Sequence, residues 1–496
     1  MSVEAAGGAR LPDVADEDRV TVHVSNTCVT FLGVVASDRG EQVVLRRRRA
    51  LAATVTLLGV LAAACGNDWG TTSAATTTSI AREDLQQGGE ANRDRFEPRP
   101  DVPGVTDDEI RYSVIGTKTG NPLGTCILDC YVAGIEAYFA YRNSQGGIYG
   151  RDLVVGDVID DELGMNQQRT LDVISRNDSF GVFEATLLPS GWGDLDAAGI
   201  PTYTWGIHAA DSANRPHNFP SAVVRCADCA RPGVPYAAGR VGATKAASIG
   251  YGISENSRVC AQTTGRAFER FEPQTGVELV YLNDDLDYGL SNGIGPQVSA
   301  MKAAGVDVIA TCIDLNGMKT LAAELRRQGM DDVILFHPNS YDRNFIAESG
   351  GLFEGDLVQV LFRPFQSDAE GTALTEFEKW MAAQGSEPTE LAMVGWLNAS
   401  LAFDGLLAAG PEFDRERVTA ATNALEGWTA GGLVSPIDWA QAHTPYTEAD
   451  PLPDVPPCIA LVRVRNNAFV PFGSPDRPWL CWTGADTDDP VPTDFE

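Results

Sequence analysis

The stretch that decides the fold is Arg111-Tyr-Ser-Val-Ile115-Gly-Thr-Lys-Thr-Gly120, together with the helical pattern that follows it. Its first five residues predict a β-strand, and 116–124 predicts a glycine-rich loop. The helix expected next carries apolar residues on one face, namely Val132, Ile135, Tyr138 and Phe139. A strand, a loop and a helix in this order begin a βαβ unit, which predicts a parallel sheet flanked by helices.

The same alternation continues and then restarts near Ala246, so two α/β units of similar size are expected. In the first unit we expect strands at 153–155, 182–183 and 201–204 and a helix at 166–176. In the second unit we expect strands at 246–250, 277–282, 306–312 and 333–336 and helices at 258–271, 294–304 and 317–328. A strand at 357–361, helices at 377–383, 391–409 and 418–425, and a hairpin of 459–464 with 468–471 complete the chain. The predicted fold class is α/β, with two Rossmann-like lobes.

The composition indicates an acidic globular protein. The 496 residues include 37 Lys and Arg against 68 Asp and Glu, which gives a net charge of −31. Such a chain repels phosphate backbones and anionic lipid, so we expect no nucleic acid partner and no polybasic membrane-binding face.

The N-terminal region has the order of an export signal. Arg46–Arg49 form a basic block, an apolar run follows at 51–64, and Cys65 comes next. Leu61-Ala-Ala-Ala-Cys65-Gly66 resembles the bacterial lipobox, with Ala62 where a larger aliphatic residue is usual. We therefore expect a signal peptide at 46–64 and lipidation of Cys65; a plain signal peptide or a signal anchor remains the alternative.

We expect different roles for the segments outside this signal. Residues 1–45 precede the basic block, and we hypothesise that translation starts at Val43 or Val44; a long cytosolic leader is the alternative. Residues 65–107 are polar and contain few apolar side chains, so they predict the lipidated cysteine and a disordered tether. Residues 486–496 predict a polar tail.

Eight cysteines remain after Cys28 and Cys65 are set aside, and an even number in an exported chain favours disulfides. Proximity suggests the pairs Cys126–Cys130, Cys226–Cys229 and Cys458–Cys481, with Cys260–Cys312 as the remainder. The rival interpretation is metal binding, because Cys226-Ala-Asp-Cys229 has the spacing of zinc ligands and His208 and His217 lie upstream. A second Cys-x-x-Cys at zinc-ribbon spacing does not follow, so we expect no metal.

An enzyme would need a set of catalytic groups that the sequence does not display. The histidines after Cys65 are His208, His217, His337 and His443, and their contexts are unrelated. The sequence contains no Gly-x-Ser-x-Gly elbow, Walker loop or His-Glu-x-x-His motif. We expect no catalysis and no cofactor, although carboxylates assembled in space are invisible to this reasoning.

The order and wording of these segments resemble the type I periplasmic solute-binding proteins of branched-chain amino acid and amide ABC importers, in the lipoprotein form found in actinobacteria. The residues that carry the resemblance are Val105–Gly120, Tyr141-Arg-Asn-Ser-Gln-Gly-Gly-Ile-Tyr-Gly-Arg151, Asp160-Asp161 and Ala198-Gly-Ile-Pro201. The resemblance spans about 105–485 and implies a clam-shell of two lobes joined by a hinge of several crossings. It places lobe 1 at 108–230 plus 357–440 and lobe 2 at 235–356 plus 441–485.

The resemblance also implies a ligand site between the lobes. Lobe 1 would contribute Thr117, Thr119, Glu184, Ala185, Thr186, Trp205 and Gly206, and lobe 2 would contribute Tyr251, Asn256, Asp314 and Asn339. Asn339 stands where amino acid binders tend to have an acidic residue, and Asp314 stands where they have an aromatic one. Either Asp314 or Glu184 then supplies the counter-charge, or the ligand is no ordinary aliphatic amino acid. Helix capping by Thr and Asn, and core packing by Trp205, are the structural alternatives.

The function implied is that of a monomeric lipoprotein on the outer face of the cell membrane, which binds a small polar solute and delivers it to ABC permease subunits. Its contact with the membrane would be through the lipid alone. A ligand-sensing domain working with a separate signalling partner, and an enzyme on the same scaffold, are the alternatives.

Overall fold

The computed structural model describes residues 101–189, 191–450 and 458–482, which belong to one compact unit, Thr76–Glu496. The expected leader, signal peptide, lipidated Cys65 and polar tail lie outside the described residues. Residues 101–107, expected as the end of the tether, are instead part of the folded body. Val102 and Val105 pack against the hydrophobic core, and the Arg111 N–H donates to the Gly104 carbonyl at 2.8 Å.

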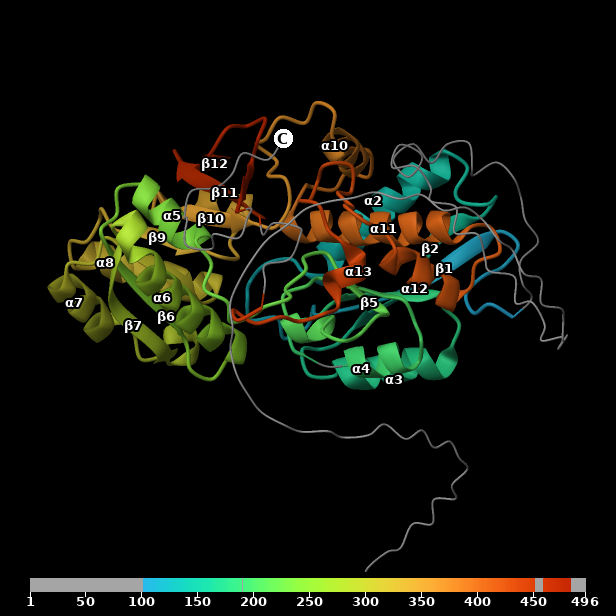
Figure 1. Ribbon diagram of the computed structural model, residues 1–496, viewed down its shortest axis with the longest axis horizontal. Coiled ribbons are helices and arrows are strands. Elements are labelled where there is room, and N and C mark those ends of the chain that lie inside the picture. The colour runs from blue at the N-terminus through green and yellow to red at the C-terminus, as the bar shows by residue number, and fades with distance from the viewer. Residues whose placement is uncertain (1–100, 190, 451–457, 483–496) are drawn as a thin grey trace, which may run out of the picture. The chain divides into compact units, whose positions relative to one another are not determined.

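The first lobe is built on a five-stranded parallel sheet with the order β2-β1-β3-β4-β5. Its strands are β1 (Glu109–Gly116), β2 (Asp152–Asp160), β3 (Gly181–Ala185), β4 (Thr202–Thr204) and β5 (Asn218–Pro220). Figure 1 shows α3 (Asn166–Arg176) and α4 (Trp192–Ala197) on one side of this sheet. On the other side lie α2 (Leu128–Ser144) and α11 (Glu390–Ala409), with α10 (Leu374–Ala383), α12 (Arg415–Asn423) and α13 (Trp439–Ala442) beside them. The predicted parallel α/β architecture is confirmed.

Helices α2 and α11 approach each other closely at two glycines. A Cβ on Gly134 would lie 1.8 Å from the Ala392 carbonyl oxygen, and one on Gly395 would lie 2.1 Å from the Tyr131 carbonyl oxygen. Both positions therefore require glycine, because any side chain would overlap the backbone of the other helix. This contact brings a segment near the C-terminus against the first helix of the lobe.

The second lobe is built on a mixed sheet with the order β12-β11-β10-β9-β8-β6-β7, and β13 pairs with β11. Its strands are β6 (Lys245–Tyr251), β7 (Glu278–Leu286), β8 (Val308–Cys312), β9 (Ile334–His337), β10 (Leu357–Val360), β11 (Cys458–Arg465), β12 (Ala468–Pro471) and β13 (Trp479–Cys481). Side chains of α5 (Gly233–Arg240) and α6 (Glu255–Thr275) pack on one face. Those of α7 (Gly295–Ala304), α8 (Leu315–Arg327) and α9 (Arg343–Glu348) pack on the other.

The structure differs from the expected elements in the placement of one strand and in several short elements. Strand β10 was expected in lobe 1. It pairs instead with β9 and β11, which supply hydrogen-bond partners for its backbone groups, and it therefore belongs to the second sheet. The unexpected elements are strands β5 and β13 and helices α4, α5, α9 and α13. The lobes are joined by three crossings, namely 221–232, 361–373 and the segment that begins at 443.

One described helix is long and apolar enough to cross a membrane, α11, but 94% of its most apolar window is buried inside the protein. It is therefore a core helix of lobe 1. Its polar Asn398 side chain donates to the Tyr131 hydroxyl at 2.6 Å and to the Thr204 carbonyl at 2.9 Å.

Candidate functional site

The predicted lobe 1 residues gather at the carboxyl ends of its parallel strands. Thr117 follows β1 and is fully buried; its hydroxyl donates to Asp161 Oδ2 at 3.0 Å and accepts the Leu187 N–H at 3.2 Å. Thr119 is exposed, and its N–H donates to the Asp160 carboxylate at 3.0 Å. The adjacent acidic residues Asp160 and Asp161 therefore fix the loop that follows β1.

Glu184, in β3, is the most unusual ionisable group at this edge. It is 1% exposed, and Thr170 donates to Oε1 at a long 3.4 Å, whereas Oε2 has no hydrogen-bond partner among the described residues. Burial raises the pKa of Glu184 to about 8, and the nearby carboxyls of Asp211 and Asp161 add to the rise while hydrogen bonds from Asn166 and Thr170 oppose it. The carboxyl is thus held in its protonated form near neutral pH.

The rest of the predicted lobe 1 set is mostly structural. The Ala185 carbonyl accepts the Thr117 N–H at 3.0 Å, and the Trp205 N–H donates to the Glu184 carbonyl at 3.0 Å. The Trp205 ring belongs to the hydrophobic core. Gly206 has φ of +84°, and a Cβ there would lie 2.6 Å from the Ala222 carbonyl oxygen, so the turn requires glycine. Thr186 is buried beside this edge.

In lobe 2, Tyr251 and Asp314 form one unit at the ends of β6 and β8. The Tyr251 hydroxyl donates to Asp314 Oδ2 at 2.8 Å, and the Tyr288 ring centre lies 5.1 Å from that of Tyr251. Asp314 also caps α8, since Oδ1 accepts the N–H groups of Asn316 and Gly317 at 2.8 and 2.9 Å. Both carboxylate oxygens of Asp314 are therefore already engaged.

Asn256 reaches the other lobe. Its Nδ2 lies 2.5 Å from Nδ1 of His208, in the loop after β4, and His208 Nε2 lies 3.0 Å from the Leu187 carbonyl oxygen. These contacts fit a neutral imidazole that donates from Nε2 and accepts at Nδ1, and burial lowers the pKa of His208 accordingly. Asn339, in contrast, is exposed after β9.

The structure thus brings ten of the eleven predicted residues to strand ends or to the contact between lobes in buried or hydrogen-bonded settings. His208 was missed as a site residue. Its position in the loop after the fourth strand of lobe 1 was the available signal, because the carboxyl-end loops of a parallel sheet form its binding edge. Whether any of these side chains contacts a ligand stays a prediction.

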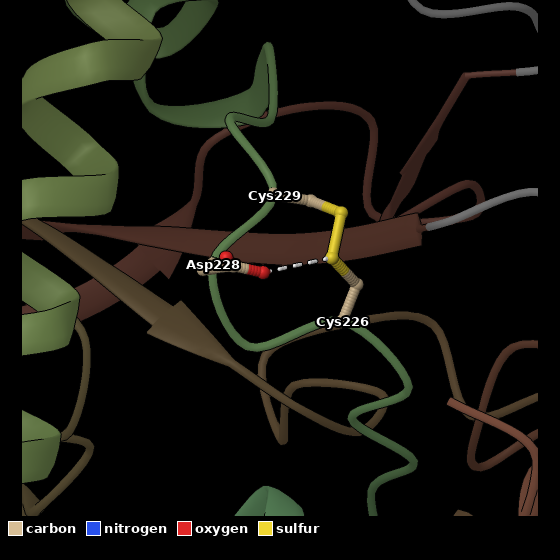
Figure 2. Close-up of side chains that lie close together, drawn as sticks. All are labelled: Cys226, Asp228 and Cys229. Atoms are coloured by element: carbon tan, nitrogen blue, oxygen red, sulfur yellow. Dashed lines mark hydrogen bonds between the residues drawn. A yellow bond between two sulfur atoms is a disulfide. The ribbon is translucent and has the colours of Figure 1, made fainter. Parts of the chain in front are cut away.

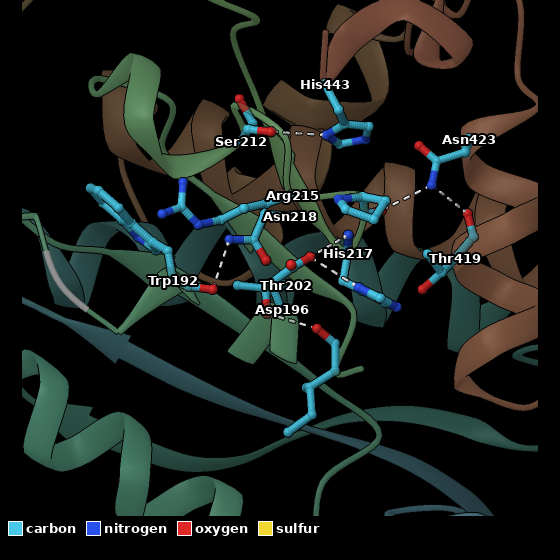
Figure 3. Close-up of polar contacts among 12 residues, drawn as sticks. Trp192, Asp196, Thr202, Ser212, Arg215, His217, Asn218, Thr419, Asn423 and His443 are labelled. Carbon is cyan, nitrogen blue, oxygen red and sulfur yellow. Dashed lines mark hydrogen bonds and ion pairs between the residues drawn. The ribbon is translucent and has the colours of Figure 1, made fainter. Parts of the chain in front are cut away.

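The remaining histidines have separate structural partners. His217 Nδ1 lies 3.0 Å from Asp196 Oδ1, and His443 Nδ1 lies 3.3 Å from the Ser212 carbonyl oxygen (Figure 3). In lobe 2, buried His337 lies 2.8 Å from the Asp356 carboxylate. The four histidines do not assemble with one another into a single catalytic arrangement.

All four predicted disulfides are confirmed: Cys126–Cys130, Cys226–Cys229, Cys260–Cys312 and Cys458–Cys481. The last of these joins directly opposed residues of β11 and β13. The Cys-x-x-Cys pair is oxidised in this structure, and it offers no thiolate to a metal in that state (Figure 2).

The comparisons with known proteins agree on one architecture. A family model described as periplasmic binding protein matches residues 110–455. No curated protein matches the chain by sequence. A branched-chain amino acid ABC transporter protein from Thermus thermophilus with bound valine is 17% identical, with a TM-score of 0.58, and the match covers 77% of this chain and 98% of that one.

Two further solved structures are equally similar. A fatty acid ABC transporter substrate-binding protein from Thermomonospora curvata is 16% identical, with a TM-score of 0.58 and coverage of 80% and 99%. A leucine-binding protein from Thermotoga maritima is 15% identical, with a TM-score of 0.57 and coverage of 73% and 98%. At these identities the similarity shows the fold alone.

Proposed function

This chain belongs to the periplasmic binding protein family, and from that premise we propose that it is the solute-binding component of an ABC importer. The observation that carries the proposal is the contact between Asn256 of lobe 2 and His208 of lobe 1, beside the carboxyl ends of the lobe 1 strands. A solute held at those ends would contact both lobes, and its differential affinity would favour the form in which they meet.

The proposed ligand is a small polar solute, such as an amino acid, an amide, urea or a small organic acid. Hydroxyl groups of Thr117 and Thr186 and backbone groups of the loops would orient its polar atoms, while Trp205 would border its apolar part. The solved relatives bind valine and, by name, fatty acids, so the fold accommodates solutes with apolar portions of very different length. The protonated form of Glu184 would act as a hydrogen-bond donor to a solute or, once ionised, as its counter-charge.

We further propose that the protein is exported and held on the outer face of the membrane by lipid on Cys65, working as a monomer with permease subunits. The signal-like segment and the cysteine after it support this proposal. Mass spectrometry of the mature N-terminus tests it: a diacylglyceryl group on Cys65 is expected, and a mature chain that begins elsewhere would reject it.

Thermal-shift screening of the purified protein against amino acids, amides, urea and aliphatic and aromatic acids tests the binding role. A true ligand at 100 times its Kd adds about 2.7 kcal/mol to the free energy of unfolding and raises the melting temperature by several degrees. A solute turned over chemically by the protein, in place of being bound and released unchanged, would contradict the proposal.

A further inference from the structure

The disulfide Cys226–Cys229 lies in the first crossing between the lobes. This crossing is held against the third one: the Tyr446 N–H donates to the Arg225 carbonyl at 3.1 Å, and Arg225 Nε donates to the Thr444 carbonyl at 2.9 Å. The guanidinium carbon of Arg225 also lies 5.2 Å from the centre of the Tyr446 ring. The loop 226–229, called here the hinge loop, is therefore fixed where the two lobes are joined.

The hinge loop brings three metal-ligand side chains together. The sulfur atoms of Cys226 and Cys229 and a carboxylate oxygen of Asp228 all lie within 4.8 Å of one another. Figure 2 shows the Asp228 carboxylate directed at Cys226. Its Oδ1 lies 3.5 Å from the Cys226 sulfur. Zinc–sulfur bonds of about 2.3 Å and zinc–oxygen bonds of about 2.0–2.2 Å at a tetrahedral angle separate two ligand atoms by about 3.5 Å. Asp228 thus already has the spacing required of a ligand that shares an ion with Cys226.

The surroundings leave room for a fourth ligand. Asp228 and Glu448 line a cavity of about 500 Å³ between the two crossings and α6. Glu448 Oε1 accepts the N–H of Ala230, the residue directly after Cys229. A water molecule from the cavity can complete a four-coordinate site. Arg266 donates to the Asp228 backbone carbonyl at 2.5 Å, which brings a positive charge to the hinge loop.

We propose that the hinge loop is a site for one soft divalent cation of the zinc type when Cys226 and Cys229 are reduced, with their thiolates and the Asp228 carboxylate as ligands. The disulfide is the oxidised, metal-free state of the same loop. An external dithiol supplies the two electrons and two protons that convert the disulfide to two thiols, and becomes a disulfide itself. The cation then displaces the two thiol protons, which pass to solvent.

The disulfide Cys126–Cys130 provides an internal control. It is also a short loop with an aspartate beside it, but Asp129 is paired with Lys118 at 2.8 Å. Its carboxylate therefore has a cation already. The two loops have similar cysteine spacing and differ in the availability of the third ligand.

The first experiment treats the full-length protein with limiting phosphine reductant and follows each cysteine by alkylation and peptide mass spectrometry. The part-exposed Cys226 is expected to react before the pairs of buried Cys312 and Cys481. One equivalent of ZnCl₂ should then slow alkylation of Cys226 and Cys229 by about tenfold or more, since ligand thiolates are withheld from reaction, and leave Cys126 and Cys130 unchanged. The proposal would be overturned by equal alkylation with and without zinc. It would also be overturned if the Cys226–Cys229 disulfide could be reduced only in the unfolded protein.

The second experiment uses Co²⁺ as a spectroscopic probe in proteins in which Cys28 and Cys65 are replaced by Ser. A cobalt–thiolate charge-transfer band is expected in the reduced protein, lost in C226S/C229S and kept in C126S/C130S. D228N should weaken cobalt binding by about 10- to 100-fold, whereas D129N should leave it unchanged. A band that persists in C226S/C229S would place the metal elsewhere and reject this site. Far-UV circular dichroism of every variant separates loss of a ligand from loss of the fold.

Discussion

Glu184 at the strand ends of lobe 1 is satisfied differently from the acidic groups at the strand ends of lobe 2. In lobe 2, Asp314 accepts three hydrogen bonds, and Asp356 is paired with His337. In lobe 1, Glu184 is buried with one carboxyl oxygen unpartnered. Burial favours the protonated form of a carboxyl, and each hydrogen bond to the carboxylate opposes that effect. Burial raises the pKa of Asp356 as well, and the contact with His337 opposes the rise. The comparison teaches that the lobe 2 carboxyls are satisfied by protein groups, whereas Glu184 of lobe 1 leaves one oxygen for a proton or a bound group.

The two lobes also differ in their disulfide bonds. Cys260–Cys312 ties α6 to the end of β8, and Cys458–Cys481 ties β11 to β13, so both stabilise lobe 2. The lobe 1 disulfide Cys126–Cys130 closes a loop outside its sheet. Two predictions test this contrast and two more test the contacts that join the lobes, beginning with the largest effect.

Replacement of Cys260 and Cys312 by serine should lower the free energy of unfolding most. The bond spans 52 residues, and a loop of that length restricts the unfolded chain by about 4 kcal/mol. Urea-induced unfolding measures the loss. In the control variant C126S/C130S the disulfide that is removed spans only 4 residues, so the free energy of unfolding should fall by about 2 kcal/mol. Equal losses in the two variants would show that lobe 2 does not depend on its longer link.

The E184Q variant should remove a pH dependence from lobe 1. Below pH 4.5, the ordinary pKa, Glu184 is protonated in both the folded and the unfolded chain. Between 4.5 and about 8 the unfolded chain releases this proton and the folded one retains it, so the free energy of unfolding falls as pH rises. From pH 5 to pH 8 Glu184 contributes about 3 kcal/mol to this fall, so the fall should be smaller by that amount in E184Q. The part that remains in E184Q comes from Asp211, Glu390 and Asp404, because burial raises their pKa values to about 7, 8 and 6.

Urea unfolding at a series of pH values measures this difference, with the exposed Glu269→Gln on α6 as the matched control. The control should follow the wild-type profile. An E184Q profile that parallels the wild type would show that Glu184 is ionised in the folded protein at pH 8, and the contrast between the lobes would fail.

N256A should weaken solute binding by about five- to tenfold, because one hydrogen bond between the lobes contributes about 1 kcal/mol. This prediction rests on the proposed function, and isothermal titration with the solute found by the thermal-shift screen measures it. Replacement of exposed Gln384 at the end of α10 is the control and should leave the affinity unchanged. An unchanged affinity in N256A would mean that the contact with His208 is independent of the bound solute.

The smallest effect is expected for Tyr446, which lies where the first and third crossings contact each other. Y446L removes the ring that lies beside Arg225 and Arg231 and should cost about 0.5–1 kcal/mol in thermal unfolding. Y446F keeps the ring and should lose less than Y446L does. Equal losses in both would assign the stabilisation to the Tyr446 hydroxyl, which accepts a hydrogen bond from Arg231.

The sequence predicted long, periodic elements better than short or context-dependent ones. The strands 246–250 and 306–312 were found because several β-rich residues occur in a row, and all four disulfides were found from proximity and remainder. Strand β5 was missed because Asn218-Phe-Pro220 is too short to show alternation, and its pairing with β4 is visible only in three dimensions. Strand β10 was assigned to the wrong lobe because sequence order does not say which sheet edge is vacant.

The candidate site was predicted by location more than by role. Asp314 was expected as a ligand or counter-charge, yet it caps α8, since a capping aspartate and a binding aspartate both follow a strand. His208 was treated as an isolated histidine because its partner, Asn256, is distant in sequence. The state of Glu184 could not be predicted, because burial depends on the packing of α3 against the sheet.

Helix α11 has a consequence for biosynthesis. A chain that is exported, as proposed here, passes through the translocation channel unfolded, and a 20-residue helix of this hydropathy resembles a stop-transfer segment at that moment. Asn398, near the middle of the helix, and Asp404, in its C-terminal half, interrupt the apolar sequence and oppose partition into lipid. In the folded lobe the same two side chains bind Tyr131 and Trp428. The polar groups that anchor this helix in the protein core therefore also favour its passage across the membrane over retention within it.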